Sequence, residues 1–449
     1  MKGGMSAKNG RSIAFFTALI FLAHPVQTQA VTYIWQRSAS LATLFYLASM
    51  VCYAHSRLQP GKFIYAVSIA ACVAAMFTKE IAITIPFTIA LYEFFFIGGP
   101  VKEIKKIILI LLPFFLTLPI IPLMLTRSHD LTLEVMRSEG ISRFVSETVM
   151  KRSEYFFTEL NVIRTYFRLL FFPMEQNLDY DTPIVKSLLE SNAFFSLIFL
   201  AAIFLSAVFL LKKFPVISFG VLWIFLTLSV ESLVAQNDVI FEHRLYLPMA
   251  GFSMALAAGV ENFLKHKKRF MVILSLIVII FSVATYLRNR VWQNDYTLWQ
   301  DVISKSPHKY RGFSNLALAY ERDKNYDKAV EYFEKSIERT PDNARERYNL
   351  GLVYFEKGDH EKAVEAFKKA IELKPDYDKA YNNLGVEYIR VGRAGEAFDA
   401  FSKAVEINPR FAGAYKNLGK YYSDHGDREK ATDYFERAQN LIGQAEKTI

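Results

Sequence analysis

Residues 349–375 read NLGLVYFEKGDHEKAVEAFKKAIELKP, and residues 383–409 read NLGVEYIRVGRAGEAFDAFSKAVEINP. The two stretches lie 34 residues apart and keep Asn, Leu, Gly, Tyr, Ala, Phe, Ala and Pro at the same places. The same spacing separates Pro307, Pro341, Pro375 and Pro409. A fixed period of this length, with helical patterning inside each unit, predicts a row of stacked helix pairs.

This pattern is typical of the tetratricopeptide repeat. Partial sets of the same positions precede and follow the two complete ones, beginning at Leu316 and at Leu418. We therefore expect an α-solenoid of four repeats at 310–343, 344–377, 378–411 and 412–445, led by a connecting helix within 292–309.

Asparagine also recurs at this period, just before each Leu-Gly or Leu-Ala pair, as Asn315, Asn349, Asn383 and Asn417. Stacked repeats would align these side chains along a concave groove. An amide both donates and accepts hydrogen bonds, so such a ladder could hold an extended polypeptide by its backbone. The alternative, that these residues only pack adjacent repeats, carries equal weight.

Residues 1–291 have a different character, because long apolar runs dominate them. A bilayer crossing needs about 20 such residues. We predict an all-α chain, with a polytopic transmembrane bundle of about nine spans followed by the solenoid. The predicted spans are 12–23, 38–55, 61–78, 80–97, 104–126, 191–211, 214–235, 244–264 and 269–287.

The basic excess lies entirely in this first part, which carries a net charge of +10, whereas residues 292–449 carry −1. Its Lys and Arg cluster in short loops between apolar runs, which indicates membrane orientation rather than nucleic-acid binding. With these loops in the cytoplasm, the repeats are extracytoplasmic, in the cytoplasmic membrane if the chain is bacterial. Four other segments share that side: 24–37, 79–80, 127–190 (with an interfacial helix at 160–172) and 236–244.

The sequence gives little support for disulfide, metal, redox or nucleotide chemistry. Cys52 and Cys72 both lie in apolar stretches, where a buried free thiol is the ordinary state. The sequence contains no CxxC pair, HExxH motif or phosphate-binding loop. We therefore predict no metal site and no certain cofactor; a divalent metal is possible but unsupported.

Three motifs of the first part form an ordered set: HPVQTQAV at 24–31 with Gln36-Arg37, KEIAIT at 79–84, and EHRLYLP at 242–248 with Gly251-Phe252. This set, followed by the repeats, resembles the transmembrane and tetratricopeptide-repeat proteins, which are protein O-mannosyltransferase-like members of the C-type integral-membrane glycosyltransferases. The resemblance implies sugar transfer from a polyprenyl-phosphate donor to Ser/Thr hydroxyls on the extracytoplasmic side. It also implies two further N-terminal spans, enclosing an acidic catalytic loop. Compared with that arrangement, the chain begins just before the third span. We therefore expect this polypeptide to lack the acidic residue that acts as the main catalytic base.

The resemblance requires a carboxylate to accept the hydroxyl proton and cations to stabilise the leaving phosphate. The candidate carboxylates, all weak, are Glu80, Asp179, Asp181 and Glu242. The candidate phosphate ligands are Lys79, Arg244, Arg164, Arg168, Arg37 and His24. Interfacial snorkelling is the ordinary role for such Lys and Arg residues, and Glu80 and Glu242 are expected mainly to orient Lys79 and Arg244.

Two other functions stay open at this point. The chain is alternatively a non-catalytic, membrane-anchored scaffold whose repeats recruit protein partners. A weaker possibility is a glycan polymerase or ligase that acts on lipid-linked oligosaccharide.

Overall fold

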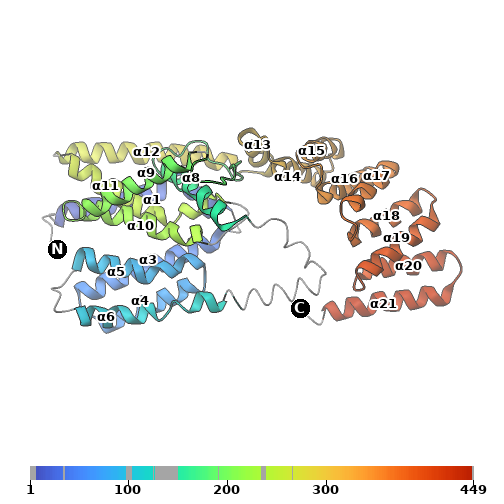
Figure 1. Cartoon of the computed structure of the whole chain (residues 1–449), viewed down its shortest axis with the longest axis horizontal. Helices are drawn as coiled ribbons and strands as arrows, with labels where there is room; N and C mark the ends of the chain where they lie inside the picture. Colours follow the sequence, from blue (N-terminus) through green and yellow to red (C-terminus); the bar gives the residue numbers. More distant parts are fainter. Residues whose placement is uncertain are drawn as a thin grey trace. The chain divides into compact units, whose positions relative to one another are not determined.

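The computed structural model describes residues 7–33, 36–97, 104–124, 126, 150–190, 192–233, 239–264 and 266–446. Over these ranges all regular secondary structure is helical, which confirms the all-α class (Figure 1). The described residues up to Gln293 form one compact unit, and those from Asn294 onward form a second. Each unit is described here by itself.

The first unit consists of two helical groups, each with its own apolar core. One core joins α1 to α8–α12 through residues such as Phe16, Leu170 and Phe281, and the other joins α3–α6 through residues such as Tyr53 and Phe114. Helices α10 and α11 contribute to both cores. The elements are α1 (Ala7–Ala23), α2 (Gln27–Thr32), α3 (Arg37–Leu58), α4 (Lys62–Met76), η2 (Glu80–Thr84), α5 (Ile85–Tyr92), η3 (Glu93–Ile97), α6 (Ile104–Phe115), α8 (Arg152–Phe171), α9 (Ala193–Phe209), α10 (Pro215–Leu233), η6 (Glu242–Leu245), α11 (Pro248–Phe263) and α12 (Lys267–Val291).

Three helical segments of this unit are long and apolar enough to cross a membrane: Glu80–Ile97, Ile104–Met124 and Lys267–Val291. Four shorter apolar helices accompany them. Helix α9 exposes a row of large apolar side chains, including Phe195, Ile198 and Phe209. Such a surface is costly in water and favourable in lipid. These features indicate a membrane protein, while the number of nine spans stays a prediction.

Helix α8 begins at Arg152, eight residues before the helix predicted at 160–172, and ends at Phe171. One face of α8 is buried against α9 and α10, and its buried residues include Tyr155, Glu159 and Tyr166. The sequence pattern missed the first turns because Arg152 and Glu154 make them polar. An interfacial position for α8 stays a prediction.

Helices α10 and α11 approach closely where two glycines face each other. A Cβ on Gly251 would lie 2.5 Å from the carbonyl oxygen of Gly220 and 2.7 Å from the Trp223 ring. Small residues allow this kind of backbone contact between membrane helices.

We expect Gly251→Leu to lower the free energy of unfolding by about 3 kcal/mol, since neither the carbonyl nor the indole can yield enough space. Gly259→Leu is the matched control on the same helix, because its Cβ would meet only Ile217 at 4.0 Å. Thermal unfolding of both variants in detergent measures the loss of stability. An equal loss in the two variants would contradict the close approach of α10 and α11 at Gly251.

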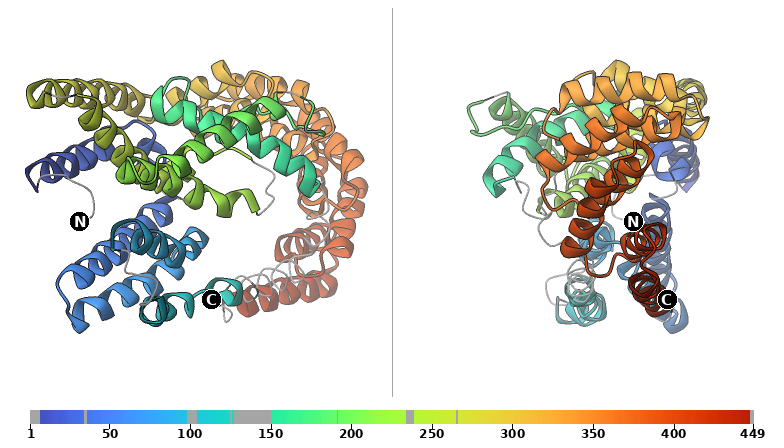
Figure 2. Two further views of the ribbon diagram at one scale, coloured as in Figure 1. Left: turned by 60° about the vertical axis from the view of Figure 1, so that its left-hand side comes forward. Right: turned by 90° about the vertical axis from the view of Figure 1, so that its right-hand side faces the viewer.

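The second unit begins with α13 (Asp295–Lys305), whose N-terminus is capped by the Asn294 side chain. Four helix pairs follow and pack in sequence, as Figures 1 and 2 show. The pairs are α14 (Tyr310–Arg322) with α15 (Tyr326–Arg339), α16 (Ala344–Lys357) with α17 (His360–Leu373), α18 (Asp378–Arg390) with α19 (Ala394–Ile407), and α20 (Ala412–Asp424) with α21 (Arg428–Glu446).

The repeated Gly and Phe positions have a direct packing role. A Cβ on Gly351 would lie 2.6 Å from the Phe367 ring, and one on Gly385 would lie 2.5 Å from the Phe401 ring. Each glycine therefore lets the first helix of a pair rest on the aromatic ring of the second. This contact explains why the two residues recur together in the sequence.

Candidate functional site

The three motifs that carry the family resemblance lie together in the first unit. The backbone N–H of His243 in η6 donates to Gln29 Oε1 in α2, across 2.7 Å and 214 residues of chain. Lys79, which precedes η2, is close enough to His243 to lower the pKa of that imidazole. The rings of Phe21 and Tyr246 pack edge to face at 5.5 Å. We call α2, η2 and η6, with the flanking His24 and Lys79, the motif cluster.

His24 is a fixed, uncharged part of this cluster. Its Nε2 lies 3.0 Å from the Leu170 carbonyl oxygen, and its Nδ1 accepts from the Val26 N–H at 3.2 Å. Burial lowers the pKa of His24 to about 4, although the Leu170 hydrogen bond acts in the opposite direction. The ring is therefore neutral near pH 7 with both nitrogens engaged, which argues against the predicted contact with a phosphate.

Glu242 is fully enclosed and holds the loop that follows α8. Its carboxylate accepts from the Tyr180 hydroxyl at 2.6 Å, the Asn177 N–H at 2.7 Å and the Gln176 amide at 2.9 Å. Burial raises the pKa of Glu242, and Arg288 together with these hydrogen bonds opposes the rise. The predicted acids Asp179 and Asp181 belong to this loop, Asp179 half-buried and Asp181 exposed.

We expect Glu242→Ala to cost about 3 kcal/mol of unfolding free energy, because three donors would lose their shared acceptor. Glu175→Gln in the same loop is the control, since that side chain is 82% exposed. Hydrogen exchange at residues 176–180 should rise in the first variant only. Unchanged protection in Glu242→Ala would show that the carboxylate does not hold the loop.

Arg244 is buried and paired within the protein. Its Nη1 lies 3.5 Å from Glu159 Oε1 and donates to the Val239 carbonyl at 2.8 Å. The guanidinium also lies over the Phe241 ring, 5.3 Å from its centroid. A phosphate could reach Arg244 only after this arrangement opened, so the structure favours a structural role.

The other predicted cations are more accessible. Lys79 and Glu80 are half-buried where η2 begins, and Arg37 is exposed at the start of α3. In α8, Arg164 is half-buried, while Arg168 is exposed and donates to the Met174 carbonyl at 3.1 Å. Lys79 alone among these four belongs to the motif cluster. The described residues contain no group of three metal-ligating side chains.

Sequence reasoning missed several residues of this region, among them Glu159, Tyr180 and His243. His243 is buried beside the Phe241 ring, and its Nδ1 has no hydrogen-bond partner within the described ranges. Burial, with Lys79 and Arg244 nearby, lowers the pKa of His243 to about 2. Only its place in the EHRLYLP motif could have drawn attention to it.

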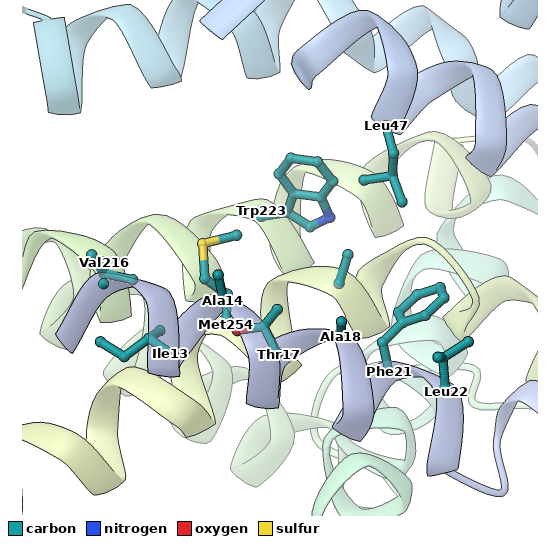
Figure 3. A pocket seen from close by; sticks show the side chains of 12 residues that line it. Ile13, Ala14, Thr17, Ala18, Phe21, Leu22, Leu47, Val216, Trp223 and Met254 are labelled. Carbon is teal, nitrogen blue, oxygen red and sulfur yellow. The ribbon is translucent and has the colours of Figure 1, made fainter. Parts of the chain in front are cut away.

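An apolar pocket of about 600 Å³ lies beside the motif cluster, between α1, α3, α10 and α11. Figure 3 shows Ile13, Thr17 and Phe21 along α1, with Leu47 of α3 across the pocket. Phe21 lines the pocket and also contacts Tyr246, the residue that directly follows η6 of the motif cluster. The pocket can therefore take a hydrocarbon chain whose polar end meets the cluster.

The repeated asparagines lie half-buried on the first helix of each pair. Asn383 donates to the Tyr348 hydroxyl at 3.0 Å, and Asn417 donates to Asn382 Oδ1 at 2.8 Å, so both bond to the preceding repeat. Asn315 donates to the Arg311 carbonyl of its own helix. Asn349 makes no hydrogen bond through its side chain to any described residue. Two of the four predicted ladder residues, Asn383 and Asn417, therefore use their amide N–H groups in hydrogen bonds between repeats.

Comparison with known proteins supports the repeats and, over about 70% of the chain, the resemblance to the O-mannosyltransferase-like family. The tetratricopeptide-repeat family matches residues 310–376, 348–410 and 412–444, which confirms the repeats. The chain is 24% identical over 352 residues to the human protein O-mannosyl-transferase TMTC3, covering 70% of this chain and 38% of that protein. Similarity to the mouse protein of that name is 23% over 356 residues, with coverage of 71% and 38%. The chain thus spans about two fifths of the length of these relatives.

Among solved structures, the chain is similar to MamA. One crystal structure is 27% identical and covers 33% of this chain and 88% of its own, with a TM-score of 0.32.

Proposed function

We propose that this chain is an integral-membrane glycosyltransferase-like protein. In this proposal it transfers a sugar from a polyprenyl-phosphate donor to Ser/Thr hydroxyls of polypeptides held by its repeats. The observation that carries the proposal is the meeting of three distant motifs in one cluster beside an apolar pocket. The similarity to proteins named O-mannosyl-transferases supports the same reaction class.

The membrane arrangement that we propose has nine spans, with the motif cluster and the repeats on the extracytoplasmic side. The three long apolar segments, the shorter apolar helices and the apolar exterior of α9 support it.

In the reaction, the acceptor hydroxyl oxygen forms a bond to the anomeric carbon of the sugar. The bond from that carbon to the phosphate oxygen breaks, and the lipid phosphate leaves with the bonding electron pair. Lys79 would stabilise the charge that develops on this phosphate, while the apolar pocket would hold the adjoining lipid chain. Arg37, Arg164 and Arg168 are further cations for the phosphate, each outside the motif cluster.

The hydroxyl proton passes to a carboxylate, for which Glu80 is the candidate within the cluster. Asp179 and Asp181 lie on the neighbouring loop. Glu242 is the weakest of the four candidates, because its oxygens already accept three hydrogen bonds from that loop.

Blocking the pocket tests this proposal. Ala18 lines the pocket, so Ala18→Trp should fill it and reduce binding of a polyprenyl-phosphate sugar at least about tenfold, since the lost apolar contacts exceed about 1.4 kcal/mol. Ala202→Trp is the matched control on the exposed face of α9. Equal donor binding in the two variants, measured in nanodiscs, would exclude the pocket as the lipid site.

A second candidate function is a non-catalytic membrane scaffold that recruits proteins through its repeats. The specific observation in its favour is that Arg244 and Glu242 are enclosed by partners within the protein. A scaffold predicts that polypeptides bind the repeats while the full chain transfers no sugar to them.

A further inference from the structure

Three buried side chains of the motif cluster carry a polar atom that makes no hydrogen bond to any described residue. These atoms are Gln27 Oε1, Thr28 Oγ1 and His243 Nδ1. The residues are only 6%, 4% and 7% exposed, so contact with water does not compensate for the missing bonds. Such groups are rare in folded proteins, and each is unfavourable by itself. Here they occur in two adjoining elements, α2 and η6, which indicates a common cause.

Contacts around α2 show where these atoms lie in the motif cluster. The Gln27 amide donates to the Phe21 carbonyl at 3.2 Å, and Phe21 lines the apolar pocket. Gln29 of α2 accepts from the His243 N–H at 2.7 Å. Lys79 is in turn close enough to His243 to lower the pKa of its ring. The three atoms therefore border both the pocket proposed for the lipid chain and the cation proposed for the phosphate.

The chemistry of the three atoms suits neutral hydroxyl groups. Gln27 Oε1 can only accept a hydrogen bond, the Thr28 hydroxyl can donate or accept, and a neutral imidazole nitrogen does either according to its tautomer. His243 is neutral near pH 7, because burial and the nearby cations lower its pKa to about 2. An acceptor such as Gln27 Oε1 repels the oxygens of a phosphate diester, which also only accept. A sugar hydroxyl both donates and accepts, so sugar hydroxyls can bond to all three atoms.

We infer that Gln27, Thr28 and His243 bind the hydroxyl groups of the donor sugar, and that these bonds select the sugar. The inference rests on the proposed glycosyltransferase function and assigns the residues that recognise the sugar. The phosphate stays with Lys79 and the lipid chain with the apolar pocket, so the three parts of the donor meet three different kinds of surface. Such bonds discriminate strongly, since a sugar without the matching hydroxyl leaves buried polar atoms unpaired.

The sugar reaches these atoms when α2 moves away from η6. Helix α2 suits such a movement, because it has only six residues and its N-cap residue, Val26, makes no side-chain hydrogen bond to it. The bond from the His243 N–H to Gln29 opens in this step. The entering sugar then satisfies atoms that have no partner among the described residues. Arg244 differs, because a ligand there would have to displace an existing ion pair and hydrogen bond.

Donor binding without any acceptor polypeptide tests the inference. The full chain in neutral nanodiscs is titrated with polyprenyl-phosphate glucose and polyprenyl-phosphate mannose, which differ in the configuration of one hydroxyl. Polyprenyl methyl phosphate is the reference ligand, because it is a phosphate diester with the same charge and lipid chain but has no sugar. The ratio of affinities, sugar donor over methyl diester, measures recognition of the sugar alone.

Thr28→Val is the main variant, because it removes the hydroxyl and keeps the shape of the side chain. Thr32→Val is its matched control, the same change at an exposed position at the end of α2. His243→Phe removes the imidazole nitrogens in a second variant. Thermal unfolding in detergent should show Thr28→Val to be no less stable than the parent, since the lost hydroxyl oxygen has no hydrogen-bond partner within the described ranges.

We expect the parent chain to bind the better sugar donor at least about tenfold more tightly than the methyl diester. Thr28→Val and His243→Phe should each reduce that ratio at least about threefold, while Thr32→Val leaves it unchanged. Equal affinity of the parent for donor and methyl diester would overturn the inference and leave the lipid site of the proposed function intact. The same holds if the two variants match Thr32→Val or weaken both kinds of ligand equally. Failure of the parent to bind any of the three lipids would instead overturn the proposed function, and the inference with it.

Discussion

Replacing Arg244 with methionine in the full chain is expected to lower the free energy of unfolding by about 3–5 kcal/mol. The side chain is 1% exposed and pairs with Glu159, itself 3% exposed. Removing the cation leaves a buried carboxylate without its charge partner, which is far more costly than removing the pair together. Denaturant unfolding in detergent, followed by tryptophan fluorescence, measures the loss.

The double variant Arg244→Met/Glu159→Met separates this explanation from a role in binding phosphate. It should recover most of the lost stability, because two apolar side chains replace the ion pair. Arg37→Met is the control for removing an exposed cation, with an expected change within about 0.5 kcal/mol. If Arg244→Met were as stable as the parent chain but no longer bound donor, the predicted phosphate contact would be correct and the structural role wrong.

Replacing Lys79 with glutamine is expected to reduce sugar transfer about 10²–10³-fold, the usual effect of removing a group that stabilises developing charge. Lys79 is the accessible cation of the motif cluster, and its loss should leave folding unchanged because the side chain is half-buried rather than enclosed. The measurement is the rate at which a Ser/Thr peptide gains sugar mass.

Lys62→Gln provides the matched control, since Lys62 begins α4 outside the cluster and should affect transfer less than about twofold. A Lys79→Gln variant that transfers sugar at the rate of the parent would remove Lys79 from the mechanism. The next cations to replace would then be Arg164 and Arg168 of α8, with the same measurement of sugar transfer.

The repeats could be predicted from the sequence because their contacts are local and periodic. Gly351 meets Phe367 sixteen residues later, and the same pair returns as Gly385 and Phe401, so the pattern is visible without any long-range information. The hydrogen-bond partners of the repeated asparagines were harder to predict from the sequence, because the bond from Asn383 to Tyr348 depends on how two repeats stack.

The motif cluster could be predicted only in part. Apolar runs and basic loops indicate helices and their order, and the resemblance pointed to the segments that carry His24, Lys79 and Arg244. The partners of these residues could not be inferred, because Glu159 lies 85 positions before Arg244 and Tyr180 lies 62 positions before Glu242. Periodicity within one helix does not show which side chain another helix will bring to it.

Transfer of sugar by the purified chain is the most direct test of the central claim. The full chain in nanodiscs is incubated with a polyprenyl-phosphate sugar and a Ser/Thr-rich peptide, and mass spectrometry follows the mass of the peptide. The proposal predicts one or more sugar residues on Ser or Thr, with the Lys79→Gln variant much slower. Tight peptide binding with no sugar added would contradict the proposal and establish the scaffold instead.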